Sequence, residues 1–524
     1  MTRPAEAPTG WEGGTQLPVL ARNVSTRYLA IAVEAGLGVL LLPFNLAHLG
    51  AATYGLWMVA ASITAYFSIL DLGYGGALVK FVAQYRARRD ARAINEILST
   101  LFLLFTGVGV VAWLVAAGLA SHLDTFFNLS AEQARTGGLV LLIVSTNVAA
   151  GFAFSVFGGV INGFQRYDLN NVVGTATAIL VALANVAVLA AGYGLVELVA
   201  ATTAVRLGAY VVYRHNAYRV FPALSISPSL ASAARLKEVT GFSVFMLLLD
   251  WAAKVNYSVD ALVIGAFLGT AQVAVWTVAQ RLAEVIQRLT NQLNDVLFPA
   301  VVDSDTDDRA DRLRLIFVQG TRLSLAAVLP AACTVGLLAG PIVTGWVGPG
   351  YDLSVAVLQV LAVVVAIRVG TATATTVLKG AGRHKLLAAS NVVTAAGNLV
   401  LSLVLVRRFG LTGVAYGTLL PVAFAALFVL FPAACRRVGI GLGTALREAV
   451  WPAAWPGLVV ALGLAAARPF VPPSLVVAAL YAAAAGSLYL VLFLRWGLPA
   501  RDRRLYLSKA AGLLARVRRL EATT

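Results

Sequence analysis

Six Lys and Arg side chains fall inside hydrophobic stretches of this chain, and four of them lie in its second half. They are Arg206, Lys254, Arg281, Arg288, Arg322 and Arg368. A cation at the centre of a bilayer costs about 2.5–3.5 kcal/mol, so a chain that carries several usually turns them toward a polar cavity. Guanidinium stays charged at physiological pH and binds phosphate oxygens in a bidentate geometry. These residues therefore indicate a path for an anionic substrate.

The most regular pattern of this kind lies within residues 271–299. Polar side chains recur there at spacings of three and four residues, at Arg281, Glu284, Arg288, Asn291 and Asp295. This spacing places them on one face of a helix, and lipid cannot solvate such a face. We predict that the face lines a cavity. The alternative is a structural contact in which Glu284 pairs with both arginines along the helix.

Two other apolar segments carry similar groups. Residues 241–267 contain Asp250, Lys254 and Asp260, and residues 25–47 contain Arg27 and Glu34 on one helical face. The predicted substrate-binding cations are Arg281, Arg288, Lys254, Arg27 and Arg368. The predicted coupling or gating residues are Glu34, Asp250, Asp260, Glu284, Asp295 and Asn291. A structural ion pair is an equal alternative for Asp250 and Lys254, and Arg206 and Arg322 could instead brace neighbouring helices.

The composition sets the class to which these segments belong. Of 524 residues, 59% are hydrophobic and only 12% are charged, and mean hydropathy is +0.82; a soluble protein has about 25% charged residues. Apolar stretches of about 20 residues, enough to cross the hydrocarbon core, recur along the chain. We predict an all-α polytopic membrane protein with about fourteen transmembrane helices. Its approximate spans are 25–47, 54–72, 97–120, 137–160, 170–192, 195–213, 241–267, 271–299, 317–346, 353–378, 385–406, 411–433, 449–466 and 474–494.

The distribution of basic residues predicts the orientation. With the N-terminus inside, thirty of the 40 Lys and Arg residues fall in inside segments and only four in outside ones. Both termini are therefore expected in the cytoplasm. The net charge of +16 is explained by this asymmetry and not by nucleic acid. Residues 501–524 form a basic amphipathic tail that we expect to bind anionic membrane lipid.

An internal repeat organises the spans. Residues 49–60 align with residues 268–279, bringing Trp57 onto Trp276, and residues 163–166 align with 380–383. Each repeat holds six spans, so the two are parallel and surround a central cavity. The predicted domains are a disordered tail (1–20), an N-lobe (21–215), a cytoplasmic linker (216–240), a C-lobe (241–436), spans 13 and 14 (437–500) and the basic tail (501–524).

Several short motifs are distributed along the chain: Tyr54-Gly-Leu-Trp57, Leu70-Asp-Leu-Gly73, Asn162-Gly-Phe-Gln-Arg-Tyr167 and the segment 260–269. With these motifs the chain resembles bacterial polysaccharide flippases of the multidrug/oligosaccharidyl-lipid/polysaccharide exporter superfamily. The resemblance covers roughly residues 20–440. It implies transfer of a polyprenyl-pyrophosphate-linked oligosaccharide to the outer leaflet of the bacterial plasma membrane by alternating access. It also implies that the protein is not an enzyme, needs no cofactor and has no catalytic or metal-binding residues.

The alternative function is a cation-coupled multidrug exporter of the related branch. Such an exporter is expected to line its cavity with acids, whereas the candidates in residues 271–299 are mixed or net basic. The expected partners are the lipid-linked oligosaccharide, anionic lipid and other membrane proteins of polysaccharide assembly. Nucleic acid is not among them.

Overall fold

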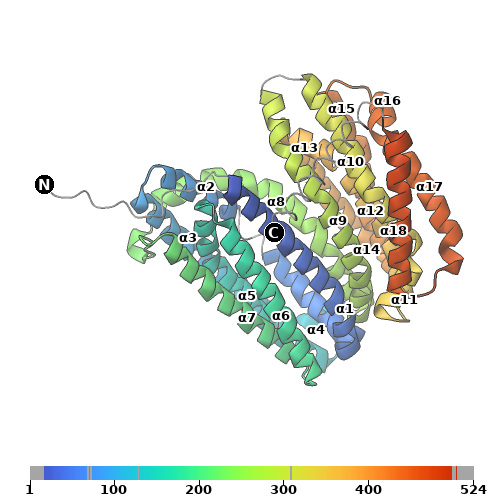
Figure 1. Cartoon of the computed structure of the whole chain (residues 1–524). Coiled ribbons are helices and arrows are strands. Elements are labelled where there is room, and N and C mark those ends of the chain that lie inside the picture. Colours follow the sequence, from blue (N-terminus) through green and yellow to red (C-terminus); the bar gives the residue numbers. More distant parts are fainter. Residues whose placement is uncertain are drawn as a thin grey trace, which may run out of the picture. The chain divides into compact units, whose positions relative to one another are not determined.

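The chain folds as an all-α polytopic membrane protein, as predicted. The computed structural model describes residues 17–498 except 68–69, 71–72, 128 and 307–309, together with residue 503. Within the helices, the side chains of residues 17–22, 24, 242–258, 289, 291–300 and 302–306 lie outside this description. Throughout the described ranges, every regular element is a helix (Figure 1).

The chain packs as two compact units. The first comprises Met1–Thr277 together with Val406–Leu411. Its helices are α1 (Leu17–Phe67), α2 (Tyr74–Ala87), α3 (Ala91–Ala120), α4 (Leu123–Phe127), α5 (Ala131–Gly163), α6 (Tyr167–Ala190), α7 (Leu195–Val220), η2 (Pro228–Leu230), α8 (Ala233–Leu268) and the start of α9 (Thr270–Thr306).

The second unit comprises Val278–Leu405 and Thr412–Thr524. After α9 its helices are α10 (Ala310–Leu337), α11 (Ala339–Val347), α12 (Asp352–Gly370), α13 (Ala372–Gly380), α14 (His384–Phe424), η3 (Ala425–Leu430), α15 (Phe431–Arg437), α16 (Leu442–Ala445), η4 (Leu446–Val450), α17 (Trp451–Ala467), η5 (Arg468–Phe470), α18 (Leu475–Leu492) and η6 (Phe493–Gly497). These packing units differ from the predicted lobes, which rest on the repeat and stay a prediction.

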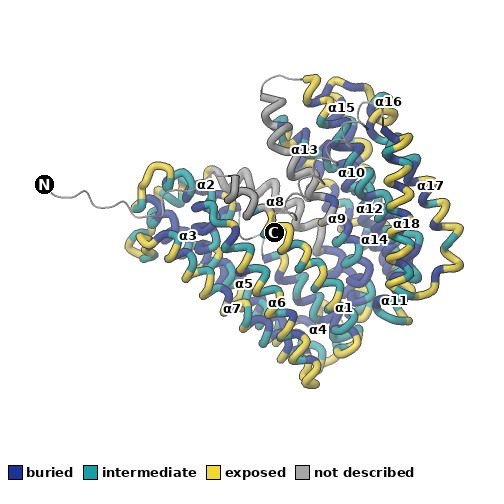
Figure 2. Tube along the Cα trace, viewed as in Figure 1, coloured by how far each residue is buried: buried dark blue, intermediate teal, exposed yellow. Residues whose placement is uncertain are grey.

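Ten helices of the described chain are long and apolar enough to cross a membrane. Two of them, Ser25–Phe67 and His384–Arg437, each contain two predicted spans, so the ten accommodate twelve of the fourteen. The other two predicted spans fall in α8 and α9. Large apolar side chains are exposed on the helices, as at Leu462 and Val476. Exposed positions recur along α17, for example (Figure 2). Such a surface suits lipid, because lipid tails are as apolar as the side chains.

The predicted span 317–346 is interrupted, which sequence periodicity did not anticipate. Helix α10 ends at Leu337, and α11 begins at Ala339. Pro341 has no N–H, and its ring would clash with the carbonyl of Leu337, four residues earlier, so a continuous helix is disfavoured there.

Repeat-related positions share unusual backbone conformations. Gly50 has φ 73° and ψ 163°, and its repeat equivalent Gly269 has φ 87° and ψ 167°. Gln165 and its equivalent Gly382 both have positive φ, 61° and 68°. A positive φ is rare for residues other than glycine. Because Gln165 adopts it as Gly382 does, the backbone turn at this position does not depend on a glycine.

Helices α1 and α9 approach closely at Gly55. A Cβ built on Gly55 would collide with the carbonyl oxygen of Thr270 and lie 3.3 Å from the backbone nitrogen of Ala274. Ala274 is the predicted repeat equivalent of Gly55.

We expect Gly55→Ala to destabilise the protein, because backbone atoms cannot move aside as a flexible side chain can. The expected cost is at least about 1–3 kcal/mol, typical of overpacking. Gly107→Ala is the matched control, since its Cβ would meet nothing within 4 Å. Gly107→Ala should be neutral or stabilising, because alanine favours a helix. The melting temperatures of the two variants, measured by thermal unfolding in detergent, would test this difference. Equal melting temperatures would contradict the close approach of α1 and α9.

Candidate functional site

The predicted stripe on α9 contains a compact charged triad in the second unit. The Glu284 carboxylate lies 3.7 Å from the Arg281 guanidinium and 3.5 Å from that of Arg288, and it accepts a 2.9 Å hydrogen bond from Gln280. The Arg281 and Arg288 side chains are 34% and 53% exposed. Glu284 therefore pairs with both arginines, but at distances longer than a charge-assisted hydrogen bond. The triad has a net charge of +1 and half-exposed guanidinium groups.

The other predicted site residues are distributed over both units. Arg27 and Glu34 are exposed on α1, and Asp260 is buried on α8, all in the first unit. Arg368 is half-buried on α12 in the second. The side chains of Asp250, Lys254, Asn291 and Asp295 lie outside the described part of the chain. Convergence of these groups on one central cavity therefore stays a prediction.

The second unit also contains an apolar groove that the sequence analysis did not identify. Its volume is about 720 Å³. Its walls come from α10, α12 and the segment from η3 to α17. The lining is apolar except for Gln359, Thr371 and Cys333. Leu282, next to Arg281, packs in the same apolar cluster as Leu325, Leu329 and Cys333 of the groove wall. The groove and the triad therefore lie in the same unit, and Leu282, the chain neighbour of Arg281, packs against the cluster that borders the groove.

Two π-helical turns contribute to the wall of this groove. The N–H of Phe431 donates to the carbonyl of Ala426, and the N–H of Trp451 donates to that of Leu446, five residues back in each case. Each turn is followed, after one intervening residue, by a proline, Pro432 or Pro452. Proline cannot donate to the carbonyl four residues earlier and clashes with it, which disfavours a regular turn. The Phe-Pro and Trp-Pro pairs are the sequence signal that would have located these turns.

Arg322 connects two helices in the second unit. Bracing of neighbouring helices was the alternative that the sequence analysis gave for this residue. This arginine is only 4% exposed. Its Nε and Nη2 atoms donate to the backbone carbonyl of Glu448, at 3.2 and 2.6 Å. The Glu448 side chain in turn lies 3.5 Å from Arg314.

In the first unit, the segment after α7 is bound to α3. The Asn95 side chain donates to the carbonyl of Ala223 at 2.8 Å and accepts from the N–H of Ser225 at 3.0 Å. The N–H of Ser232 donates to the Thr100 hydroxyl at 2.9 Å. Much of the predicted linker is therefore held along one helix.

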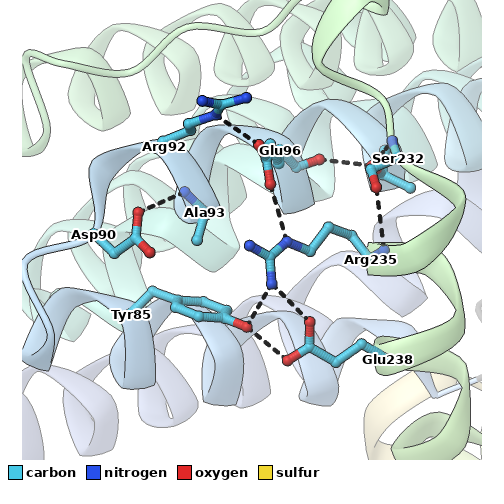
Figure 3. Close-up of polar contacts among 9 residues, drawn as sticks. Tyr85, Asp90, Arg92, Ala93, Glu96, Ser232, Arg235 and Glu238 are labelled. Carbon is cyan, nitrogen blue, oxygen red and sulfur yellow. Dashed lines mark hydrogen bonds and ion pairs between the residues drawn. The ribbon is translucent and has the colours of Figure 1, made fainter.

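Arg235, near the start of α8, is the centre of this attachment (Figure 3). It donates to Glu96 on α3 at 3.0 Å, to Glu238 at 3.0 Å and to the Tyr85 hydroxyl on α2 at 2.9 Å. Tyr85 donates to Glu238 at 2.6 Å. Burial alone would raise the pKa of Glu238, but the hydrogen bonds from Tyr85 and Arg235 outweigh it, and the pKa is lowered. Burial and the bond to Glu238 raise the pKa of Tyr85.

We expect Arg235→Met to destabilise the first unit by about 1–3 kcal/mol, because it leaves two carboxylates without their shared donor. Arg92→Met is the control: Arg92 also pairs with Glu96, but it is 85% exposed, so the expected cost is below about 1 kcal/mol.

The same network should make folding stability depend on pH. Since folding lowers the pKa of Glu238, the contribution of Glu238 to folding stability should be lost as pH falls through that pKa. Melting temperatures across this range would test both effects, and equal losses in the two variants would contradict the network.

Comparison with known proteins assigns this architecture to a family. Residues 20–304, more than half of the chain, match the family described as polysaccharide biosynthesis protein. The chain belongs to this family. Among curated relatives, a probable flippase, AglR, from Haloferax volcanii is 24% identical over 418 residues, covering 78% of this chain and 83% of that protein. An uncharacterised membrane protein, EpsK, from Bacillus subtilis is 21% identical over 335 residues, covering 63% of this chain and 66% of that one.

Solved structures show the same fold. The lipid II flippase MurJ in an inward closed conformation matches with TM-score 0.68 and 13% identity, covering 90% of this chain and 98% of that one. An inward-facing multidrug resistance transporter of the MATE family matches with TM-score 0.58 and 16% identity, covering 78% and 94%. The family match and this fold confirm the resemblance stated from the sequence. At these identities the structural matches are evidence for the fold alone.

Proposed function

We propose that this protein translocates a polyprenyl-pyrophosphate-linked oligosaccharide from the cytoplasmic to the outer leaflet of the bacterial plasma membrane by alternating access. The observation that carries the proposal is that one unit contains both a net-basic triad and an apolar groove. A lipid-linked oligosaccharide has the matching chemistry, an anionic pyrophosphate on a long apolar chain. Membership of the polysaccharide biosynthesis family and similarity to a probable flippase support it.

The triad supplies the contacts for the pyrophosphate. Arg288 and Arg281 are exposed enough to bind phosphate oxygens, and their bonds to Glu284 are long enough to be exchanged. Phosphate binding would replace these pairs with shorter bidentate bonds. Glu284 would then compete for the same arginines and favour release. Arg27, Lys254 and Arg368 are the further cations proposed for the path, and Glu34, Asp250, Asp260, Asn291 and Asp295 are proposed for coupling or gating.

The groove supplies space for the apolar chain. The bilayer interior is as apolar as the groove lining, so a chain gains little hydrophobic free energy by entering it. Occupancy is instead set by space and packing, and a linear polyprenyl chain suits an apolar groove between helices. We further propose that both termini are cytoplasmic and that residues 501–524 bind anionic lipid. Partner proteins of polysaccharide assembly would act on the same lipid.

A leaflet assay in proteoliposomes tests the function. A fluorescent undecaprenyl-pyrophosphate oligosaccharide is incorporated, and its accessibility to an external glycosidase is followed with and without protein. Protein-dependent change of leaflet is expected. If the substrate stays in its leaflet while an organic cation is exported down an imposed ion gradient, the multidrug exporter is the correct function. The net-basic triad disfavours that outcome, because a cation would be repelled.

A further inference from the structure

The wall of the groove at η4 contains a carbonyl group that cannot form the regular hydrogen bond of an α-helix. In a regular helix the carbonyl of Glu448 would accept from the N–H of residue 452, four positions later. Residue 452 is proline, which has no N–H. An unsatisfied backbone carbonyl in the membrane interior is costly, so spanning segments satisfy these groups internally. Arg322 of α10 donates two N–H groups to this carbonyl in place of the missing one.

This bond joins two walls of the groove. Leu446 and Val450, at either end of η4, line the groove on one side, and Leu325 and Leu329, one and two turns after Arg322, line it from α10. The guanidinium therefore fixes the distance between α10 and η4 at this point. The Arg314–Glu448 ion pair, 3.5 Å long, adds a second connection between the same two elements.

The π-turn also determines which side chains face the groove. A π-turn contains one residue more than the corresponding α-turn, and one residue corresponds to about 100° of rotation about the helix axis. If η4 became a regular α-turn, the residues on one side of it would rotate by roughly that amount relative to the rest. Leu446 and Val450 would then no longer present the same surface to the groove.

From this geometry we propose that Arg322 is a positioning residue for the lipid chain: it replaces the N–H that Pro452 lacks and thereby holds the η4 π-turn as a wall of the groove. The proposal rests on the proposed function, because it assigns the chain of the lipid-linked substrate to this groove. It explains why a charged side chain that is almost fully buried lies within a membrane-spanning helix, where it would otherwise be costly.

The test separates positioning from simple stabilisation by restoring the missing N–H. Arg322→Met should lower the melting temperature by several degrees and translocation by at least about tenfold, because the Glu448 carbonyl loses its donors. In Arg322→Met with Pro452→Ala, alanine supplies the N–H within the helix. We expect the melting temperature to return to that of Pro452→Ala alone, while translocation stays low because the π-turn has been removed.

Two results would overturn the proposal. If translocation recovers together with the melting temperature, Arg322 only satisfies a carbonyl and does not position a lipid chain. If neither recovers, the coupling between Arg322 and Pro452 is wrong.

A second measurement is independent of transport. Cys333 lines the groove and is partly exposed, whereas Cys435 is buried and can be replaced by alanine. In this background, alkylation of Cys333 by N-ethylmaleimide is followed with and without undecaprenyl phosphate. Protection is expected in the wild type and not in the double variant, and protection in both contradicts the proposal. If the wild type shows neither protection nor translocation, the proposed function fails, while the recovery of melting temperature still tests the Arg322–Pro452 coupling.

Discussion

Arg288→Glu and Arg281→Glu are each expected to reduce translocation of a lipid-linked oligosaccharide by at least about tenfold. A charge-assisted hydrogen bond to phosphate contributes about 1.5–3 kcal/mol, and 1.4 kcal/mol corresponds to a factor of ten. Reversal also places a second carboxylate beside Glu284, which lies 3.5 Å from Arg288 and 3.7 Å from Arg281. The triad would then change from net positive to net negative and repel the pyrophosphate.

The leaflet assay in proteoliposomes measures this effect, with protein orientation and reconstitution efficiency matched between variants. Arg436→Glu is the control for net charge, since Arg436 is exposed at the end of α15 in the same unit and outside the triad. It should retain translocation. Arg288→Lys should lie between wild type and Arg288→Glu, because an ammonium group keeps the charge but loses bidentate geometry. Unchanged translocation in both charge-reversal variants would exclude the triad from the substrate path.

Val363→Trp is expected to block the same reaction by filling the groove. Val363 lines the groove from α12 and is 48% exposed, so a larger side chain can be accommodated without disturbing the core of the unit. The indole would occupy space that we assign to the polyprenyl chain. Overpacking of a filled site costs about 1–3 kcal/mol, which corresponds to a reduction of roughly 5- to 150-fold.

The matched control is Leu353→Trp, on the same helix and 50% exposed, but outside the groove lining. Its translocation and melting temperature should resemble those of the wild type. The effect of Val363→Trp should depend on the length of the lipid carrier. This variant should lose more translocation with an undecaprenyl carrier than with a short isoprenoid carrier. Equal losses for both carriers would show that the groove does not bind the distal part of the chain.

The sequence alone determined the properties that depend on local composition and spacing. Long apolar segments predicted a polytopic helical protein, since each must span about 30 Å of hydrocarbon as a helix with its backbone bonds satisfied internally. Short motifs such as Tyr54-Gly-Leu-Trp57 predicted the family that residues 20–304 confirm. The spacing of Arg281, Glu284 and Arg288 also indicated the pairing that was the alternative to a cavity-lining face, because such pairing follows from helix geometry.

Only the tertiary structure decided how residues distant in the chain meet. The bond from Arg322 to the Glu448 carbonyl joins positions 126 residues apart, and the Arg235–Glu96 pair joins positions 139 apart. No local period encodes such contacts. The groove also depends on contacts between segments that are distant in the chain. Pro432 and Pro452 can be read from the sequence, and they favour the π-turns that precede them. These turns form the wall of a cavity only because α10 and α12 supply its other walls.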